Sequence, residues 1–578
     1  MNTHYTDEVN TQIVISLLKE HKIKKVIASP GATNIRLVAS MQQDDFFEMY
    51  SVVDERSAAY IACGMAEESG EPVVLTCTGA TASRNYIPGL TEAFYRKLPI
   101  VAITSTQHYG RVGQNVAQVI DRSRPLADIV KCSVQIPTCH TDEDRWDCNV
   151  KVNNAILELT RNGGGPIHID LETHTYSTNF DVKELPKQRV IRRYTAEDSL
   201  PPMPNGKIGV FVGAHSKWSE ALTAAADRFC AKYNAVVLCD QTSNYRGAYR
   251  VLCPLALNSS CNDFDVIVDI GNITGAYPYF RCKEFWRVNP DGEIRDTYKK
   301  LTNVFQMSEQ NFFEQYSKDC TDEKNSFLIE WKNAYDEIYN KIPELPFSNI
   351  WIAKQSASKL PENSILHLAI LNTLRSWNFF ETPNSVRCYS NTGGFGIDGV
   401  MSAAIGSALA NRDANVYCII GDLAFFYDMN SLGNRHLPSN LNIMLINNGK
   451  GTEFRNYNHP GAQFADDADA FIAAADHYGA KSHELVKHYA SDLGCEYMSA
   501  SSKDGYLSLA DVFFKPDSSD KPVVFEVFTN WKDESDALEA VNFSTVSDEQ
   551  RQKNEIKNAV KKVVGKKGIE VIKKIRGH

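Results

Sequence analysis

Short apolar runs that end in turn residues alternate with helix-patterned segments in the first part of the chain. The run 24–31 (KKVIASPG) stops at Pro-Gly, and runs 72–77 (PVVLTC) and 97–107 (KLPIVAITSTQ) also lead into polar turns. Runs of this length indicate buried strands, and strands that alternate with helices indicate a parallel sheet. We therefore predict a first α/β domain over residues 1–182.

The same alternation continues further along the chain and predicts two more α/β domains, over residues 183–347 and 348–578. Residues 181–205 are polar and proline-rich, which indicates a linker. The glycines of the central domain do not form a G-x-G-x-x-G fingerprint, so we predict no nucleotide there. The predicted fold class is α/β, with three doubly wound parallel-sheet domains.

The C-terminal tail has a different character. From Arg551 it is rich in lysine, and apolar residues from Ile556 to Val564 recur at helical spacing. This pattern predicts a basic amphipathic helix. Packing on its own domain is favoured over contact with a membrane.

Composition narrows the class of protein. The chain has 578 residues, of which 43% are hydrophobic and 23% charged, and a net charge of −10. That charge argues against nucleic acid as a partner, and no apolar run reaches transmembrane length. The start of the chain lacks the pattern of a signal peptide. The 14 cysteines show no metal or disulfide spacing, and Cys77, Cys239 and Cys418 lie in apolar runs. We expect reduced thiols in a cytoplasmic protein without stable membrane insertion.

Two apolar runs of the third domain, predicted to be strands, are each followed at the C-terminal end by a side chain with an oxygen that can bind a metal. Asp422 closes the first run and Asn448 the second, 26 positions later. This spacing fits one helical crossover between neighbouring parallel strands. Open parallel sheets bind ligands at that edge, and carboxylate and amide oxygens suit Mg²⁺.

An acidic pair follows an apolar strand in the first domain. Glu55 comes directly before an alanine-rich helix pattern, so its carboxylate can be partly buried and exchange a proton near neutral pH. The alternative is that Asp54 and Glu55 simply cap the helix start.

The ordered motifs resemble those of thiamin-diphosphate-dependent enzymes. GIDG (396–399), GDLAFFYDMN (421–430) and NN (447–448) are similar to the diphosphate signature of that family. The run TGATASRNYIPGLTEA (78–93) resembles the segment that helps to build the pyrimidine end. The form with Leu423 is most similar to the group that makes 2-succinyl-5-enolpyruvyl-6-hydroxy-3-cyclohexene-1-carboxylate in the menaquinone pathway.

The resemblance implies thiamin diphosphate and Mg²⁺ as cofactors, and a central domain without FAD. It implies that Glu55 hydrogen-bonds the aminopyrimidine ring, and that the side chains of Asp422 and Asn448 and the carbonyl of Lys450 bind the metal. Ile397 would support the bent cofactor. The further implied cofactor contacts are Thr78, Gly79, Asn85, Gly393, Asp398, Gly421, Leu423, Gly451 and Thr452. In this family the site forms between two subunits, which implies a homodimer or homotetramer.

The substrate pocket departs from that synthase group. Arginines of the group are replaced by Thr33 and Thr392, its TADRP segment reads TSTQH (104–108), and its basic pair falls in 272–277, which holds no basic residue. Threonine cannot replace a bidentate arginine, so a different substrate is expected. The predicted substrate-binding residues are Thr33, Asn34, Gln114 and Thr392. The predicted catalytic residues beside Glu55 are Glu453, Gln118 and His108, and His459 is a further pocket candidate.

The resulting hypothesis is decarboxylation of a 2-oxo acid with transfer of the acyl anion to a carbonyl acceptor. A polar pocket would suit a hydroxylated acceptor. One alternative is a 2-oxo acid decarboxylase that does not ligate. Another is a non-catalytic scaffold with the same fold, against which the joint presence of Glu55, Asp422 and Asn448 argues.

Overall fold

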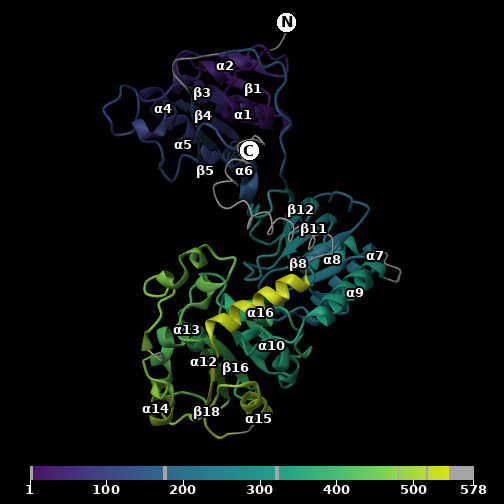
Figure 1. The fold of residues 1–578 in the computed structure, drawn as a ribbon. Helices are drawn as coiled ribbons and strands as arrows, with labels where there is room; N and C mark the ends of the chain where they lie inside the picture. The colour runs from purple at the N-terminus through teal and green to yellow at the C-terminus, as the bar shows by residue number, and fades with distance from the viewer. Residues whose placement is uncertain (1–3, 174–178, 319–324, 479–480, 516–518, 546–578) are drawn as a thin grey trace, which may run out of the picture. The chain divides into compact units, whose positions relative to one another are not determined.

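The structure is a computed structural model (Figure 1). It describes residues 4–173, 179–318, 325–478, 481–515 and 519–545. The basic helix predicted beyond Arg551 lies outside these residues. Among the residues described, no helix combines the length and the apolar character needed to cross a membrane.

Contacts divide the chain into two compact units. The first unit consists of residues 1–199 and 291–306, and the second of residues 200–290 and 307–578. The predicted boundaries of three domains stay a prediction, and the two units are described separately below.

The first unit contains a six-stranded parallel sheet with the order β2-β1-β3-β4-β6-β5. Its strands are β1 (Lys25–Ala28), β2 (Glu48–Ser51), β3 (Val73–Cys77), β4 (Ile100–Thr106), β5 (Cys132–Ile136) and β6 (Ile167–Glu172). Its helices are α1 (Val9–Glu20), α2 (Ile35–Met41), α3 (Glu55–Ser69), α4 (Thr81–Asn85), α5 (Ile87–Arg96) and α6 (Asp142–Glu158). Val26 and Val74 pack with α1, α2 and α6, whereas Ile27 and Leu75 pack with α3 and α5. Helices therefore cover both faces of the sheet.

The second unit contains a sheet with the same topology. Its order is β15-β14-β16-β17-β19-β18, and every pair is parallel. The strands are β14 (Ile365–Leu368), β15 (Arg387–Tyr389), β16 (Val416–Gly421), β17 (Leu441–Asn447), β18 (Glu496–Ala500) and β19 (Val523–Phe528). Numbered along the chain, both six-stranded sheets follow the order 2-1-3-4-6-5. The order reverses beside the first strand in each sheet, which is where such folds bind ligands.

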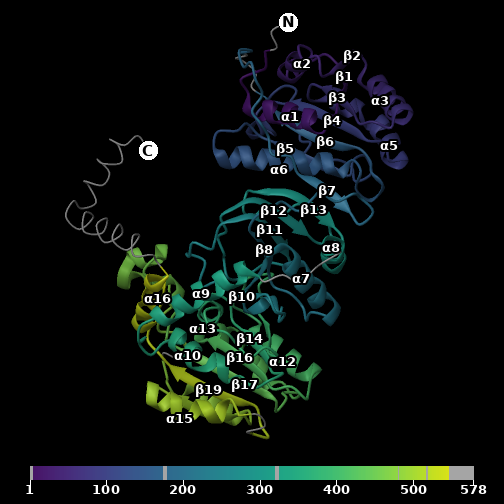
Figure 2. The ribbon, with the colours of Figure 1, turned by 90° about the vertical axis from the view of Figure 1, so that its right-hand side faces the viewer.

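Helices also cover both faces of this sheet (Figure 2). They are α10 (Asn349–Ser356), α11 (Asn372–Trp377), α12 (Val400–Ala410), α13 (Asp422–Asp428), α14 (Leu485–Asp492), α15 (Lys503–Phe513) and α16 (Trp531–Ser544). One face packs aliphatic residues such as Ile443 against α12, α13 and α14. The other face is aromatic, because Phe525 contacts Tyr506 and Phe513 of α15, and Tyr506 contacts Trp351 of α10.

The central strands of the second unit run in the order β10-β9-β8-β11-β12. They are β8 (Ile208–Val212), β9 (Val236–Cys239), β10 (Arg250–Leu252), β11 (Phe264–Ile270) and β12 (Cys282–Val288), with the helices α7 (Glu220–Tyr233), α8 (Glu309–Tyr316) and α9 (Ser326–Lys341). In the first unit, β7 (Arg192–Thr195) pairs in parallel with β13 (Leu301–Gln306). The predicted α/β fold with three parallel sheets is confirmed.

The stretch 181–205 contains β7 and so is not wholly a linker. Its sequence RRYT lacks the apolar character on which strand prediction depends.

Cysteine serves as a small core residue, as its place in apolar runs predicts. Every cysteine among the described residues is free. Cys77, Cys239 and Cys418 are fully buried within their strands. Burial raises the pKa of the Cys77 thiol to about 12, so this group is protonated and unreactive at neutral pH.

Two glycines near the contact of α3 with α5 should respond oppositely to alanine. A Cβ on Gly89 of α5 would lie 2.4 Å from the Cβ of Ala59 on α3, whereas a Cβ on Gly64 of α3 would have no atom within 4 Å. We expect Gly89→Ala to lower the free energy of unfolding by about 1–3 kcal/mol through overpacking. We expect Gly64→Ala to raise it by about 0.5–1 kcal/mol through helix propensity. Urea denaturation measures both, and equal stability of the two variants would contradict this packing.

Candidate functional site

Two neighbouring strands bring the predicted metal ligands together. β16 and β17 are parallel, and Gly421 is in register with Ile446. Asp422 therefore follows β16 at the same edge where Asn448 follows β17. The backbone N–H of Gly449 donates to Asp422 Oδ2 over 2.7 Å, which ties the two strand ends to each other.

Asp422 is a buried carboxylate. Its side chain accepts hydrogen bonds from the backbone N–H groups of Leu423 (2.8 Å) and Gly449 (2.7 Å). Burial nevertheless raises its pKa to about 6. Gly449 has a φ of +79°, a conformation that favours glycine, and so can present its N–H to the carboxylate. A carboxylate in this setting is suited to a cation, whose charge would offset the cost of burial.

Asn448 has an unsatisfied oxygen. Its amide nitrogen donates to Thr452 Oγ1 over 3.5 Å, but its Oδ1 is buried without a hydrogen-bond partner. A buried acceptor left unpaired costs about 1–3 kcal/mol. Together with Asp422 and a backbone carbonyl it forms the hard-oxygen ligand set that Mg²⁺ prefers. The residues present therefore fit the implied metal.

Lys450 can contribute only its backbone to such a site. Its ammonium group is paired with Asp469 Oδ2 at 2.6 Å and lies over the ring of Trp531. No cluster of three His, Cys, Asp or Glu residues suited to a metal occurs in the described part of the chain. A metal here would thus depend on amide and carbonyl oxygens as well as on Asp422.

The first asparagine of the NN pair has a structural role. Asn447 Nδ2 donates to Glu526 Oε1 of β19 over 2.7 Å, and the Tyr497 hydroxyl of β18 donates to Glu526 Oε2 over 2.8 Å. Burial raises the pKa of the Glu526 carboxyl. The two asparagines thus have different roles: Asn447 connects β17 to the adjacent strand β19, and Asn448 lies at the candidate metal site.

The GIDG loop precedes α12. Gly399 has a φ of +73° and caps this helix, and Ile397 packs against the core beneath it. Asp398 is exposed, and its backbone carbonyl accepts a hydrogen bond from Asn391 Nδ2 over 3.3 Å. Gly393 is exposed with open space around it, whereas Thr392 is buried.

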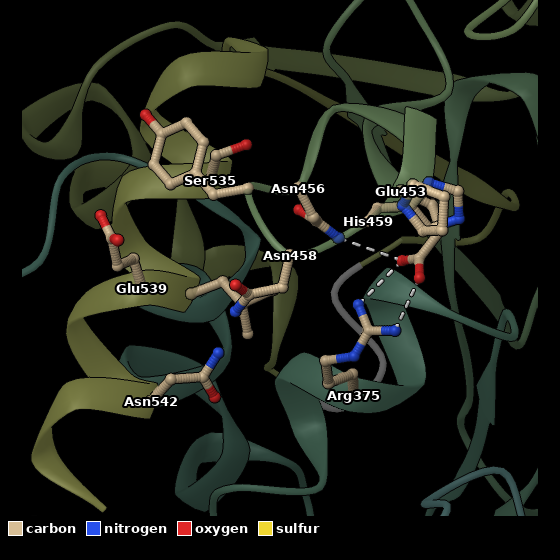
Figure 3. Close-up of a pocket in the computed structure, with 11 residues that line it drawn as sticks. Arg375, Glu453, Asn456, Asn458, His459, Ser535, Glu539 and Asn542 are labelled. Carbon is tan, nitrogen blue, oxygen red and sulfur yellow. Dashed lines mark hydrogen bonds and ion pairs between the residues drawn. The ribbon is translucent and has the colours of Figure 1, made fainter. Parts of the chain in front are cut away.

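We call residues 448–452, which carry the predicted ligands Asn448 and Lys450, the metal loop. A cavity of about 280 Å³ lies beside this loop and is lined by the next residue, Glu453 (Figure 3). Glu453 faces Arg375 of α11 there in a bidentate ion pair, with N–O distances of 2.8 and 2.9 Å. Asn456 also donates to Glu453 Oε2, over 3.2 Å. His459 lines the same cavity, and its Nδ1 accepts from the N–H of Gly461. Glu453 is thus held in place with both carboxylate oxygens engaged.

Asn372 connects this cavity to the metal loop. Its Nδ2 donates to Thr452 Oγ1 over 2.7 Å, and its Oδ1 accepts from Arg375 over 2.8 Å. Sequence reasoning missed both Asn372 and Arg375. Their stretch LNTLRSW matches no motif, and only the position just after β14, where the strand order reverses, could have signalled them.

The segment 272–277, which contains no basic residue, lies close to Arg375. A Cβ on Gly275 would lie 2.3 Å from Leu374 Cδ2, next to Arg375. The Tyr277 ring is 5.5 Å from the ring of Phe395, the residue directly before GIDG. Burial raises the pKa of Tyr277, and the nearby Arg375 charge opposes that rise. A positively charged side chain, Arg375 of α11, therefore lies near segment 272–277 although the segment itself has none.

In the first unit, the neighbouring residues Asp54 and Glu55 have different roles. The Asp54 side chain accepts from the N–H of Ser57 over 2.8 Å and so caps α3. Glu55 is the first residue of that helix and is half-buried. No hydrogen bond or ion pair to Glu55 occurs among the described residues. The helix is capped without it, so its carboxylate remains available for another task.

The turns after β1 and β3 meet where the strand order reverses. The Thr33 and Thr78 hydroxyls are 2.7 Å apart, and Thr33 also donates to the carbonyl of Ser105. Asn34 is buried and donates to the carbonyl of Ser29. Gly31 is needed here, because a Cβ would lie 2.3 Å from that of Thr78. Asn34 also lines a hollow of about 430 Å³.

The remaining candidates of the first unit lie at its surface. His108, Gln114, Gln118 and Asn85 are exposed. The carbonyl of Gln118 lies 3.0 Å from where a Cβ on Gly79 would sit, so the loop after β4 comes close to the turn after β3. The structure thus gathers Thr33, Thr78, Gly79 and Gln118 at one edge.

Fold and site together define a thiamin-diphosphate-binding enzyme. Residues 10–124 match the model of the thiamine pyrophosphate enzyme N-terminal TPP binding domain, and residues 372–510 match that of the C-terminal TPP binding domain. The chain belongs to this family.

Within the family, its relatives include proteins named 2-succinyl-5-enolpyruvyl-6-hydroxy-3-cyclohexene-1-carboxylate synthase. The protein of Bacteroides fragilis is 32% identical over 91% of this chain and 97% of its own length. That of Phocaeicola vulgatus is 30% identical over 91% and 96%. A solved structure, the Rhodococcus jostii RHA1 thiamine diphosphate-dependent 4-hydroxybenzoylformate decarboxylase, aligns over 90% of this chain and 99% of its own at 16% identity and a TM-score of 0.39.

The raised pKa of Asp422 predicts opposite effects of pH on the metal-free and loaded protein. A folded pKa of about 6 exceeds the unfolded value, so this group contributes stability at low pH that is lost as pH rises through about 6. Relative to Asp422→Ala, the metal-free protein should gain about 1 kcal/mol between pH about 7 and about 5, and about 3 kcal/mol in all once the pH falls below about 4. Stabilisation by Mg²⁺ and thiamin diphosphate should weaken over the same range, because metal binding requires the ionised carboxylate. Thermal unfolding with and without cofactor measures this, and a shared pH trend would contradict it.

Proposed function

We propose that the protein catalyses thiamin-diphosphate- and Mg²⁺-dependent decarboxylation of a 2-oxo acid and transfers the acyl anion to a carbonyl acceptor. The observation that carries this proposal is the buried, unpartnered Oδ1 of Asn448 next to the buried carboxylate of Asp422. The unpaired amide oxygen and the buried carboxylate charge both cost free energy that a bound cation would offset. A non-catalytic scaffold would have no need to retain this arrangement.

In this proposal Asp422, Asn448 and the carbonyl of Lys450 would hold Mg²⁺ and, through it, the diphosphate. The bound cofactor would supply the electron sink that decarboxylation of a 2-oxo acid requires. Glu55 would hold and move a proton at the aminopyrimidine ring. The other cofactor contacts proposed are Thr78, Gly79, Asn85, Gly393, Ile397, Asp398, Gly421, Leu423, Gly451 and Thr452.

We propose that two copies of the chain complete the site, as a homodimer or homotetramer in the cytoplasm. Exposed apolar side chains near Glu55 support this assembly. Val53 is 75% exposed, and Tyr60 and Ile61 of α3 are 49% and 44% exposed. Large exposed apolar side chains this close in sequence fit a surface that binds a partner.

The proposed substrate carries fewer carboxylates than that of the synthase relatives. Thr33 and Thr392, which stand where that group has arginines, are both buried, and the Thr33 hydroxyl is engaged by Thr78 and Ser105. The Arg375 guanidinium is already paired with Glu453. These groups favour a polar, uncharged acceptor over a dicarboxylate.

A panel of 2-oxo acids with Mg²⁺ and thiamin diphosphate tests the reaction. We expect CO₂ release from one acid of the panel, and a ligated product only when an aldehyde acceptor is added. Mass spectrometry identifies both products. Release of CO₂ with a free aldehyde as the sole product would favour the non-ligating decarboxylase. Absence of cofactor binding by calorimetry would overturn the proposal.

Replacing Glu55 by glutamine tests the proton-transfer role separately. We expect turnover to fall by at least about 100-fold, because general acid–base catalysis contributes on that scale. Cofactor affinity should change little, since the side chain keeps its shape. Asp54→Asn is the matched control: it retains the cap on α3 and should leave turnover near that of the parent. Full activity of Glu55→Gln would contradict the assignment.

A further inference from the structure

A second cavity in the second unit, of about 410 Å³, lies apart from the metal loop. Arg387, on its wall, is the first residue of β15, and Asn363 precedes β14. Asp422 and Asn448 instead follow the C-terminal ends of β16 and β17. Because these strands are parallel, the cavity and the metal loop lie at opposite edges of one sheet.

The cavity is lined by Lys217, Arg246 and Arg387, and we call it the basic cavity. None of the described residues that line it is acidic. No ion pair involves these three side chains in the part of the chain that the structure describes. Two carboxylates lie nearby: Glu381 pairs with Arg250, and Glu362 accepts from the hydroxyl of Ser385, which lines the cavity. Three positively charged side chains therefore line the cavity, and no carboxylate lies on its wall among the described residues.

Arg246 is held in place but only partly satisfied. Its Nη2 donates to Thr382 Oγ1 over 3.1 Å and to the carbonyl of Val386 over 2.8 Å. Its Nε and Nη1 are buried without a hydrogen-bond partner. Burial lowers its pKa to about 10, so it remains a cation at neutral pH. Unpaired buried N–H groups of a guanidinium are costly, and an anion is the ligand that satisfies them.

The scaffold of the basic cavity is rigid. Asn244, in the turn after β9, accepts from the N–H of Cys388 over 2.8 Å and donates to the Cys388 carbonyl over 2.9 Å. These two hydrogen bonds between the Asn244 side-chain amide and the Cys388 backbone hold the turn that carries Arg246 against the strand that carries Arg387. The two arginines are thus held in place before a ligand binds, which lowers the entropic cost of binding the ligand.

We propose that the basic cavity binds a small multivalent oxyanion, a metabolite with phosphate or carboxylate groups, at a site separate from the proposed active site. Its volume lies in the range of small-molecule pockets. Three cations on a wall without a carboxylate match a ligand with two or more negative charges. The unpartnered Nε and Nη1 of Arg246 would bind its oxygens.

Calorimetric titration of the full chain, saturated with thiamin diphosphate and Mg²⁺, tests this site. The probes are 3-phosphoglycerate, inorganic phosphate and succinate. We expect at least one to bind, and Arg246→Met to weaken it by about tenfold or more, since a hydrogen bond to a charged group is worth that much. Arg387→Met should weaken the same probe by a similar factor. Lys332→Met, which removes an exposed charge from α9 of the same unit, is the matched control and should leave affinity unchanged.

The pattern across probes identifies the anion. Binding of both phosphate compounds without succinate indicates a phosphate group, and binding of succinate indicates carboxylates. If Arg246→Met fails to fold, Arg387→Met and Lys217→Met carry the test, because Lys217 is exposed. Absence of binding by all three probes would overturn the proposal. So would unchanged affinity in the folded variants.

Discussion

The proposed site depends on one interaction, the hydrogen bond from the backbone of Gly449 to the carboxylate of Asp422. It joins the ends of two parallel strands and keeps a buried negative charge in place. The desolvation cost of that charge is only partly offset by two backbone N–H groups. Asn448, at the end of the neighbouring strand, adds a buried oxygen without a hydrogen-bond partner. The fold thus maintains a local concentration of negative potential that a divalent cation would neutralise.

The two six-stranded sheets share one strand order, and each gathers polar turns where that order reverses. In the first sheet the turns after β1 and β3 bring Thr33 to Thr78. In the other, the elements that follow β14, β16 and β17 bring Asn372 to Thr452 and Gly449 to Asp422. A repeated topology therefore yields two chemically different ends, one built of hydroxyls and glycines and the other of acidic and amide oxygens.

Features that sit directly at strand ends could be predicted from the sequence. Asp422 and Asn448 were found because an apolar run fixes the strand and the next polar residue must lie at its edge. Arg375 could not be found in this way, because its partner Glu453 is 78 positions away and no periodicity encodes that pairing. β7 was missed because its residues RRYT carry no apolar pattern. Clustering of Lys217, Arg246 and Arg387 likewise arises only from the tertiary fold.

The unpaired oxygen of Asn448 also bears on how long the protein survives in a cell. A chain that is more stable with its cofactor than without it shifts between folded and open forms according to cofactor supply. Proteases act on the open form, so small changes in stability alter abundance several-fold. Scarcity of thiamin would then reduce the amount of this protein as well as the fraction of it that carries the cofactor, without any dedicated regulator.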